Sequence, residues 1–176
     1  MDEKHIYAIA QYDEETQQRL SALYLKLVNK GYTGTQTKGI PYHVTLGTFD
    51  VEDEALVVSR ARAAAAATDR FTLRLAAVGL FGLNVLFLVP AVKAELLNLR
   101  YAIAPCRDSA DEYPWVAHTT LLMDDQPGVI QSAIPVVAEY FAPFRATVES
   151  IGVYEFFPER KIGIFPLRTG TGTGNE

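Results

Sequence analysis

The segment HVTL at residues 43–46 is nearly repeated as HTTL at residues 118–121. Each copy lies in an apolar segment rich in β-branched residues, 40–49 for the first and 115–123 for the second, which predicts a strand at both places. Successive side chains of a strand point to opposite faces, so the histidine and the threonine of each copy share a face. The sequence therefore predicts two strands that each present an imidazole beside a hydroxyl, over a backing that can be buried.

Size and composition are those of an ordinary soluble globular protein. The chain has 176 residues, of which 49% are hydrophobic and 21% charged. We expect a single domain over residues 1–168 that buries roughly 70% of the unfolded surface, followed by a disordered tail over residues 169–176. No apolar run reaches the roughly 20 residues that a membrane span needs, and residues 1–4 lack the order of a secretory signal. A cytoplasmic monomer without membrane contact is expected.

Cysteine content and charge exclude several classes of function. The single cysteine, Cys106, cannot form an internal disulfide, and no Cys/His cluster indicates zinc, so we expect neither a metal nor a cofactor. The net charge is −5 and no basic block occurs, which argues against binding to long nucleic acids. A small phosphate-bearing ligand remains compatible with this charge.

Hydrophobic spacing predicts the other elements and shows that their order is repeated. Further strands are expected at 5–12, 71–78, 84–89, 144–153 and 161–167, and helices are expected to begin after Asp13, Asp50, Pro90 and Pro127. Pro135 should kink or split the last helix. The apolar parity shifts between Val148 and Ile151, which indicates a bulge.

The order β-α-β-α-β thus occurs twice, which predicts an α+β fold. We expect two pseudo-symmetric lobes, roughly residues 5–80 and 84–154, with antiparallel sheets facing a central groove, helices outside, and a closing strand at 161–167. Twofold symmetry of this kind would place the two histidine strands across the groove from each other. A single substrate atom could then be contacted from both sides.

Four side chains, His43, Thr45, His118 and Thr120, are the candidate catalytic group. Two imidazoles facing one small anion can act as general base and general acid, because an unperturbed pKa near 6.5 allows one to be neutral and the other charged. Threonine hydroxyls can donate to non-bridging oxygens and stabilise the charge of a transition state. In-line attack on phosphorus is the chemistry that fits this set best.

Two His-x-Thr-hydrophobic motifs in a duplicated chain resemble the 2H phosphoesterase superfamily, which includes 2′-5′ RNA ligase-like proteins and cyclic nucleotide phosphodiesterases. The resemblance extends from Ile6 to Leu167. It implies metal-independent opening of 2′,3′-cyclic phosphates on small nucleotides or RNA ends. It also implies that the two histidines are the acid/base pair and the two threonines the phosphate donors. Which histidine is the base stays open.

Two positions depart from the pattern of RNA ligase-type members. Those proteins usually have an aromatic residue two places after the first motif and an arginine two places after the second, where this chain has Thr48 and Met123. The missing arginine argues against ligation and favours a small nucleotide-like substrate. A non-catalytic nucleotide-binding module on the same fold and 2′-5′ RNA ligase-type activity are the alternatives.

Aromatic and charged residues near the motifs supply the remaining candidates. Tyr154 and Phe156 are the candidate substrate-binding residues because they could line the groove. Strand parity places Tyr42 and Trp115 on the face opposite their histidines, so we expect both in the core. Arg160 and Lys161 are expected in a solvated turn.

A metal-dependent hydrolase is a further alternative, in which the histidines would be joined by Asp124 or Asp125. No carboxylate shares the His-x-Thr face within either motif, and this argues against it.

Overall fold

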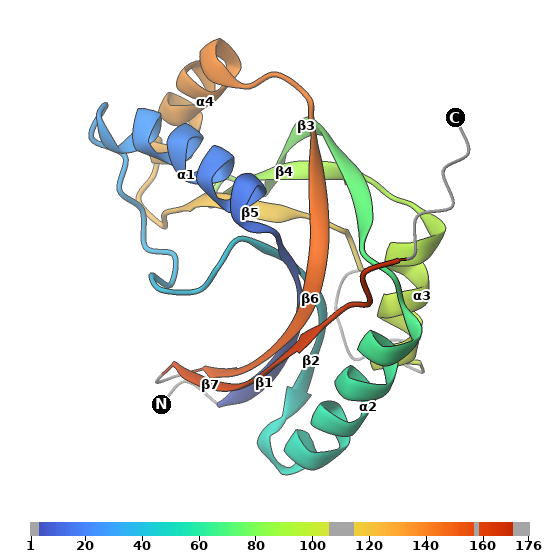
Figure 1. Ribbon diagram of the computed structural model, residues 1–176. Helices are drawn as coiled ribbons and strands as arrows, with labels where there is room; N and C mark the ends of the chain where they lie inside the picture. Colours follow the sequence, from blue (N-terminus) through green and yellow to red (C-terminus); the bar gives the residue numbers. More distant parts are fainter. Residues whose placement is uncertain (1–3, 106–114, 157–158, 171–176) are drawn as a thin grey trace.

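The computed structural model describes residues 4–105, 115–156 and 159–170, which form an antiparallel sheet flanked by helices (Figure 1). The strands are β1 (His5–Tyr12), β2 (His43–Asp50), β3 (Phe71–Phe81), β4 (Val85–Ala91), β5 (Thr119–Met123), β6 (Phe144–Phe156) and β7 (Arg160–Pro166). The helices are α1 (Glu14–Val28), the short 3-10 turn η1 (Val51–Asp53), α2 (Glu54–Ala67), α3 (Ala94–Ile103) and α4 (Val129–Tyr140). The predicted α+β class with antiparallel pairing is confirmed.

The strand order places the two motif strands at opposite ends of the sheet. The order is β2-β1-β6-β3-β4-β5, and β7 pairs with β6. The long strand β6 joins the two ends, since its first residues pair with β3 and the remainder with β1. Each end of the sheet therefore contains strands from both halves of the chain. The predicted division into residues 5–80 and 84–154 follows the repeat in the sequence rather than the pairing of the strands.

Two pairs of helices flank the curved sheet: α1 packs with α4, and α2 packs with α3 (Figure 1). Helix α1 begins where the Asp13 carboxylate accepts a 3.0 Å hydrogen bond from the Thr16 amide. Its buried stripe consists of Thr16, Leu20, Leu23 and Leu27. The chain turns away after it at Gly31, whose φ of 91° favours glycine.

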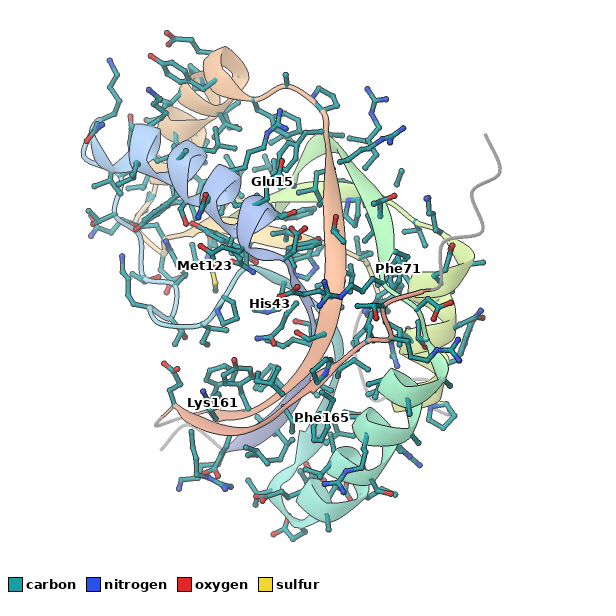
Figure 2. All side chains as sticks on the ribbon, viewed as in Figure 1. Glu15, His43, Phe71, Met123, Lys161 and Phe165 are labelled. Carbon is teal, nitrogen blue, oxygen red and sulfur yellow. The ribbon has the colours of Figure 1, made fainter. Side chains whose placement is uncertain are left out.

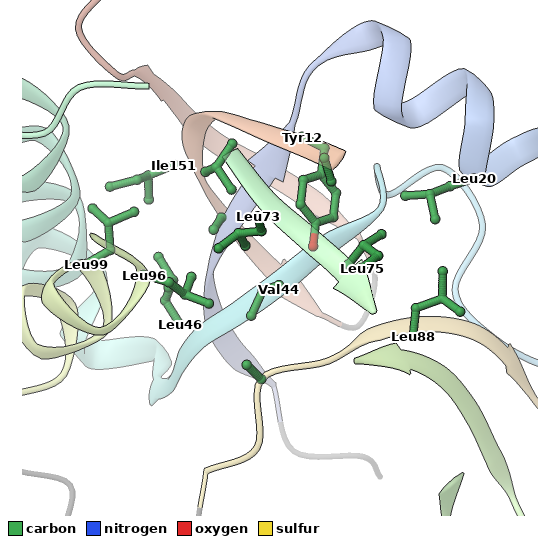
Figure 3. Packing of buried hydrophobic residues seen from close by; sticks show 14 of the residues in the cluster. Tyr12, Leu20, Val44, Leu46, Leu73, Leu75, Leu88, Leu96, Leu99 and Ile151 are labelled. Carbon is green, nitrogen blue, oxygen red and sulfur yellow. The ribbon is translucent and has the colours of Figure 1, made fainter. Parts of the chain in front are cut away.

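The hydrophobic core lies behind the motif strands. Val44 and Leu46 of β2 are fully buried and alternate with His43 and Thr45, as the predicted strand parity requires. Figure 3 shows these two side chains among buried residues of β3 and of α3. The face of the first motif opposite His43 and Thr45 is therefore part of the hydrophobic core.

The β6 bulge is confirmed. Gln11 pairs with Ser150 and Tyr12 pairs with Val148, which leaves Glu149 as the extra residue between them. This residue lies within the predicted interval.

Several predicted boundaries were wrong. Pro90 does not start a helix but lies within β4, where it pairs with Leu75 at an irregularity in β3 that accommodates a residue without an amide hydrogen. Helix α3 begins later, at Ala94. Asp50 precedes the 3-10 turn and makes no side-chain capping bond there, and α2 begins only at Glu54.

Helix α4 runs through Pro135 as one element, so the proline does not split it. Buried residues lie on both sides of the proline, Ile130 and Ala133 before it and Val136 and Val137 after it, and their packing holds the helix together. Within the described residues, no helix is both long and apolar enough to span a membrane. Cys106 and residues 171–176 of the predicted tail lie outside the described residues.

Candidate active site

The two histidines occupy equivalent positions at the two ends of the sheet. His43 is the first residue of β2, and His118 immediately precedes β5, which begins at Thr119 rather than at the predicted residue 115. Val44, Leu46, Thr119 and Leu121 are buried, whereas both histidines are half-buried. The predicted alternation therefore turns the polar face of each motif away from the core.

Both imidazoles make the same local hydrogen bond. The His43 Nδ1 lies 2.8 Å from the carbonyl oxygen of Pro41, and the His118 Nδ1 lies 2.7 Å from the carbonyl oxygen of Val116. Because a carbonyl oxygen can only accept, Nδ1 carries the hydrogen in both rings. Nε2 is then the nitrogen that takes up or releases a proton in each case.

The site favours the neutral form of both imidazoles. Burial lowers the pKa of His43 from 6.5 to about 4, against the opposing effect of the Pro41 carbonyl, and the charge of His118 lowers it further. Burial also lowers the pKa of His118, opposed by the Val116 carbonyl.

Two phenylalanines hold the His118 ring. Its centroid lies 4.7 Å from that of Phe81 in an edge-to-face arrangement and 5.2 Å from that of Phe87. These residues come from β3 and β4, so the second histidine is fixed by the hairpin next to its own strand. This packing explains the burial that lowers the pKa of His118.

A cavity of about 320 Å³ opens beside His43. It is lined by Tyr7, Gln36, Thr37, Ile40, Pro41, Tyr42, His43, Thr45, Thr120, Met123 and Phe156. Three of the four candidate catalytic side chains therefore line a single pocket, although they come from opposite ends of the sheet. His118 is not among the lining residues. Figure 2 labels His43 and Met123, which belong to this lining.

The aromatic candidates divide between pocket and core. Phe156 and Tyr154 both belong to one small buried cluster with Ile9, but only Phe156 also lines the pocket, and Tyr154 receives a 2.9 Å hydrogen bond from Gln11. Tyr42 was expected in the core, but it precedes the first residue of β2, so strand parity does not fix its direction; it packs against the core and also lines the pocket.

Besides Tyr42, sequence reasoning missed six lining residues: Tyr7, Gln36, Thr37, Ile40, Pro41 and Met123. Gln36 and Thr37 belong to the polar segment that precedes the first motif, and its position next to that motif was the available signal. Tyr7 lies on β1, whose pairing with β2 and β6 brings it beside Phe156.

A model of the 2′-5′ RNA ligase superfamily matches residues 13–156 of this sequence. The chain belongs to this superfamily. The predicted resemblance to 2H phosphoesterases is thereby confirmed. No match was found among curated proteins.

Solved structures of the superfamily share the fold across nearly the whole chain. LigT of E. coli in its apo form is 17% identical with a TM-score of 0.61, and the match covers 96% of this chain and 100% of LigT. TT0787 of Thermus thermophilus is 16% identical with a TM-score of 0.65, covering 94% and 98%. Usb1 of Kluyveromyces marxianus, solved with uridine monophosphate, is 13% identical with a TM-score of 0.51, covering 93% and 98%.

The carboxylates and cations considered from the sequence have other contacts. Asp124 accepts from the Gln126 amide and Asp125 from the Asn84 side chain, and no group of three His, Cys, Asp or Glu suited to a metal occurs among the described residues. Arg160 forms ion pairs with Glu54 and Glu155. Lys161 is exposed near the β6–β7 turn (Figure 2).

Proposed function

We propose that this protein is a metal-independent phosphodiesterase that opens 2′,3′-cyclic phosphates on small nucleotides or RNA ends. The observation that carries the proposal is the matched pair of histidines, each with Nδ1 bound to the carbonyl two residues before it and Nε2 left for proton transfer. A core or surface histidine has no reason to repeat this geometry at both ends of one sheet. Membership of the 2′-5′ RNA ligase superfamily supports the phosphodiester chemistry.

The reaction needs two proton transfers and support for the phosphate oxygens. A neutral histidine accepts a proton through Nε2 from the attacking water, whose oxygen forms the new bond to phosphorus. The bond to one ribose oxygen breaks, and the other histidine, protonated at Nε2, donates its proton to that oxygen. Thr45 and Thr120 line the pocket together and would donate hydrogen bonds to the non-bridging oxygens.

The pocket supports a nucleoside as the group attached to the phosphate. Its volume of about 320 Å³ is at the small end of ligand pockets, and Tyr7, Ile40 and Phe156 give it an aromatic and aliphatic wall. Lys and Arg are missing among its described lining residues, which argues against a polyanionic substrate. Among the similar structures, E. coli LigT was solved with 3′-AMP and K. marxianus Usb1 with uridine monophosphate.

The position of the pocket also suggests the role of each histidine. The leaving oxygen belongs to the ribose, and the pocket that would hold the nucleoside is lined by His43 but not by His118. We therefore assign His43 as the general acid and His118 as the base. Because burial lowers the pKa of His43 to about 4, its proton must be held by the bound phosphate anion, which raises the pKa of an adjacent imidazole.

Hydrolysis of the four 2′,3′-cyclic nucleotides in EDTA tests the activity. His43→Ala and His118→Ala should each lower kcat at least about a hundredfold, the usual size of acid/base catalysis, whereas His5→Ala should leave it unchanged as the matched control. Unchanged turnover in both site variants would refute the mechanism. Saturable AMP binding without any turnover by the wild type would identify a nucleotide-binding module instead.

Bis(p-nitrophenyl) phosphate tests the assignment of roles, because its leaving group departs without protonation. His43→Ala should retain turnover of this ester, and His118→Ala should lose it. The opposite pattern would reverse the two roles.

A further inference from the structure

Each segment that precedes a motif is attached to the strand of the other motif. Trp115, just before His118, donates a 2.9 Å hydrogen bond from its indole nitrogen to the carbonyl oxygen of Thr45 on β2. The acceptor belongs to the residue whose hydroxyl lines the pocket. The indole therefore links the segment that precedes His118 with the backbone of the first motif.

The segment before His43 makes the reciprocal attachment on β5. The Thr35 amide donates a 2.7 Å hydrogen bond to the Met123 carbonyl, and the Met123 amide donates a 3.2 Å bond to the Gln36 side-chain oxygen. Gln36 thus takes the place of a neighbouring strand along the free edge of β5. Gly34 permits the close approach, since a Cβ there would lie 2.7 Å from Leu122 Cδ1.

These attachments matter because the sheet alone leaves the motif strands at its two ends. β2 pairs with β1 and β5 pairs with β4, and no ladder joins β2 to β5 in the described part of the chain. β2 and β5 contact each other without pairing, so without a hydrogen-bonded link the distance between the two histidines would depend on that packing and on the twist of the strands between them. In-line transfer tolerates little error, since misplacement by about 1 Å can cost a hundredfold in rate.

We propose that Trp115 and Gln36 form a reciprocal clasp that fixes the separation of the two motif strands. They are then positioning residues for the phosphodiesterase reaction proposed above, on which this inference rests. The clasp acts through the backbone: Trp115 holds the strand of Thr45, and Gln36 holds the strand of Thr120. Neither side chain needs to touch the reacting phosphate.

Trp115→Phe and Gln36→Met remove the two hydrogen bonds while keeping side chains of similar bulk. Gln18→Met is the matched control, because Gln18 is an exposed glutamine whose amide donates to Glu14 on the outside of α1. With 2′,3′-cyclic nucleotides, both clasp variants should lower kcat at least about tenfold. Because Trp115 does not line the pocket, its variant should keep KM within about threefold of the wild type. The control should match the wild type.

Titration of the histidine ring signals by NMR separates positioning from simple loss of stability. Folded and unfolded molecules in slow exchange give separate ring signals, so a smaller folded fraction weakens the folded-state signals without shifting them. If the clasp closes the site, the pKa of His43 should rise in both clasp variants toward the ordinary value of about 6.5 as water enters. It should stay near the wild-type value in Gln18→Met.

Titrations and kcat values of both clasp variants that match the wild type would overturn the clasp. The titration does not depend on turnover. A wild-type protein inactive on every cyclic nucleotide would refute the proposed function, and a shifted His43 titration in the variants would still support the clasp. An active wild type whose two clasp variants keep both its titrations and its kcat values would support the proposed function and overturn the clasp.

Discussion

Acidification should destabilise this protein through His43, because the folded state holds its imidazole neutral. Burial lowers the pKa of His43 to about 4, whereas in the unfolded chain it returns to about 6.5. Between these two values the unfolded chain binds a proton that the folded chain does not, so stability falls as the pH falls. Linkage gives a loss of about 2 kcal/mol from about pH 7 to about pH 5, and about 3 kcal/mol by about pH 4.

The assay is urea unfolding of the wild type and of His43→Gln at several pH values from about 7 to about 4. Glutamine does not titrate, so the variant should lack the loss assigned to His43 but keep the contributions of the carboxylates and of His118. The free energy of unfolding of the wild type should therefore fall more steeply with decreasing pH than that of His43→Gln. Curves that stay parallel over this range would refute the assignment of a neutral, desolvated His43.

Substitutions at three positions test other parts of the structure. Thr120→Val should lower kcat about a hundredfold while Thr120→Ser retains it, because only the hydroxyl donates to the phosphate; equal steady-state losses in the two variants would contradict this role. Tyr12→Phe removes the 2.8 Å partner of the fully buried Thr119 hydroxyl and should lower the free energy of unfolding in urea by about 1–3 kcal/mol, and an unchanged midpoint would argue against that bond. Gly34→Ala places a Cβ 2.8 Å from the Met123 carbonyl and should speed hydrogen exchange of the Met123 amide. An exchange rate equal to that of the wild type would contradict the close approach at Gly34.

The sequence motifs predicted the local structure of the site well. Alternation along HVTL correctly placed Val44 and Leu46 in the core and turned His43 and Thr45 to the other face. The break in apolar parity predicted a bulge between Val148 and Ile151, and the structure has it at Glu149, because an extra residue shifts every following side chain to the other face. Both signals depend only on near neighbours in the chain.

The pairing of strands was beyond such signals. Alternation shows which face a residue occupies but not which strand lies beside it, so the crossing of β6 between β1 and β3 could not be inferred. Pro90 was misplaced for a related reason, since the irregularity in β3 that accommodates it is a tertiary feature. Tyr7 and Gln36 enter the pocket through contacts with distant segments.

The placement of β2 and β5 at opposite ends of one sheet has a mechanical consequence. Five steps between neighbouring strands separate them along the order β2-β1-β6-β3-β4-β5, and a change of about 2° in the twist at each step would accumulate to about 10° between the ends. A substitution in the middle of the sheet, such as at the Glu149 bulge, can change the local twist and so displace the strands at the two ends. Where the clasp of Trp115 and Gln36 is removed, the reaction geometry would therefore become sensitive to residues that never approach the substrate.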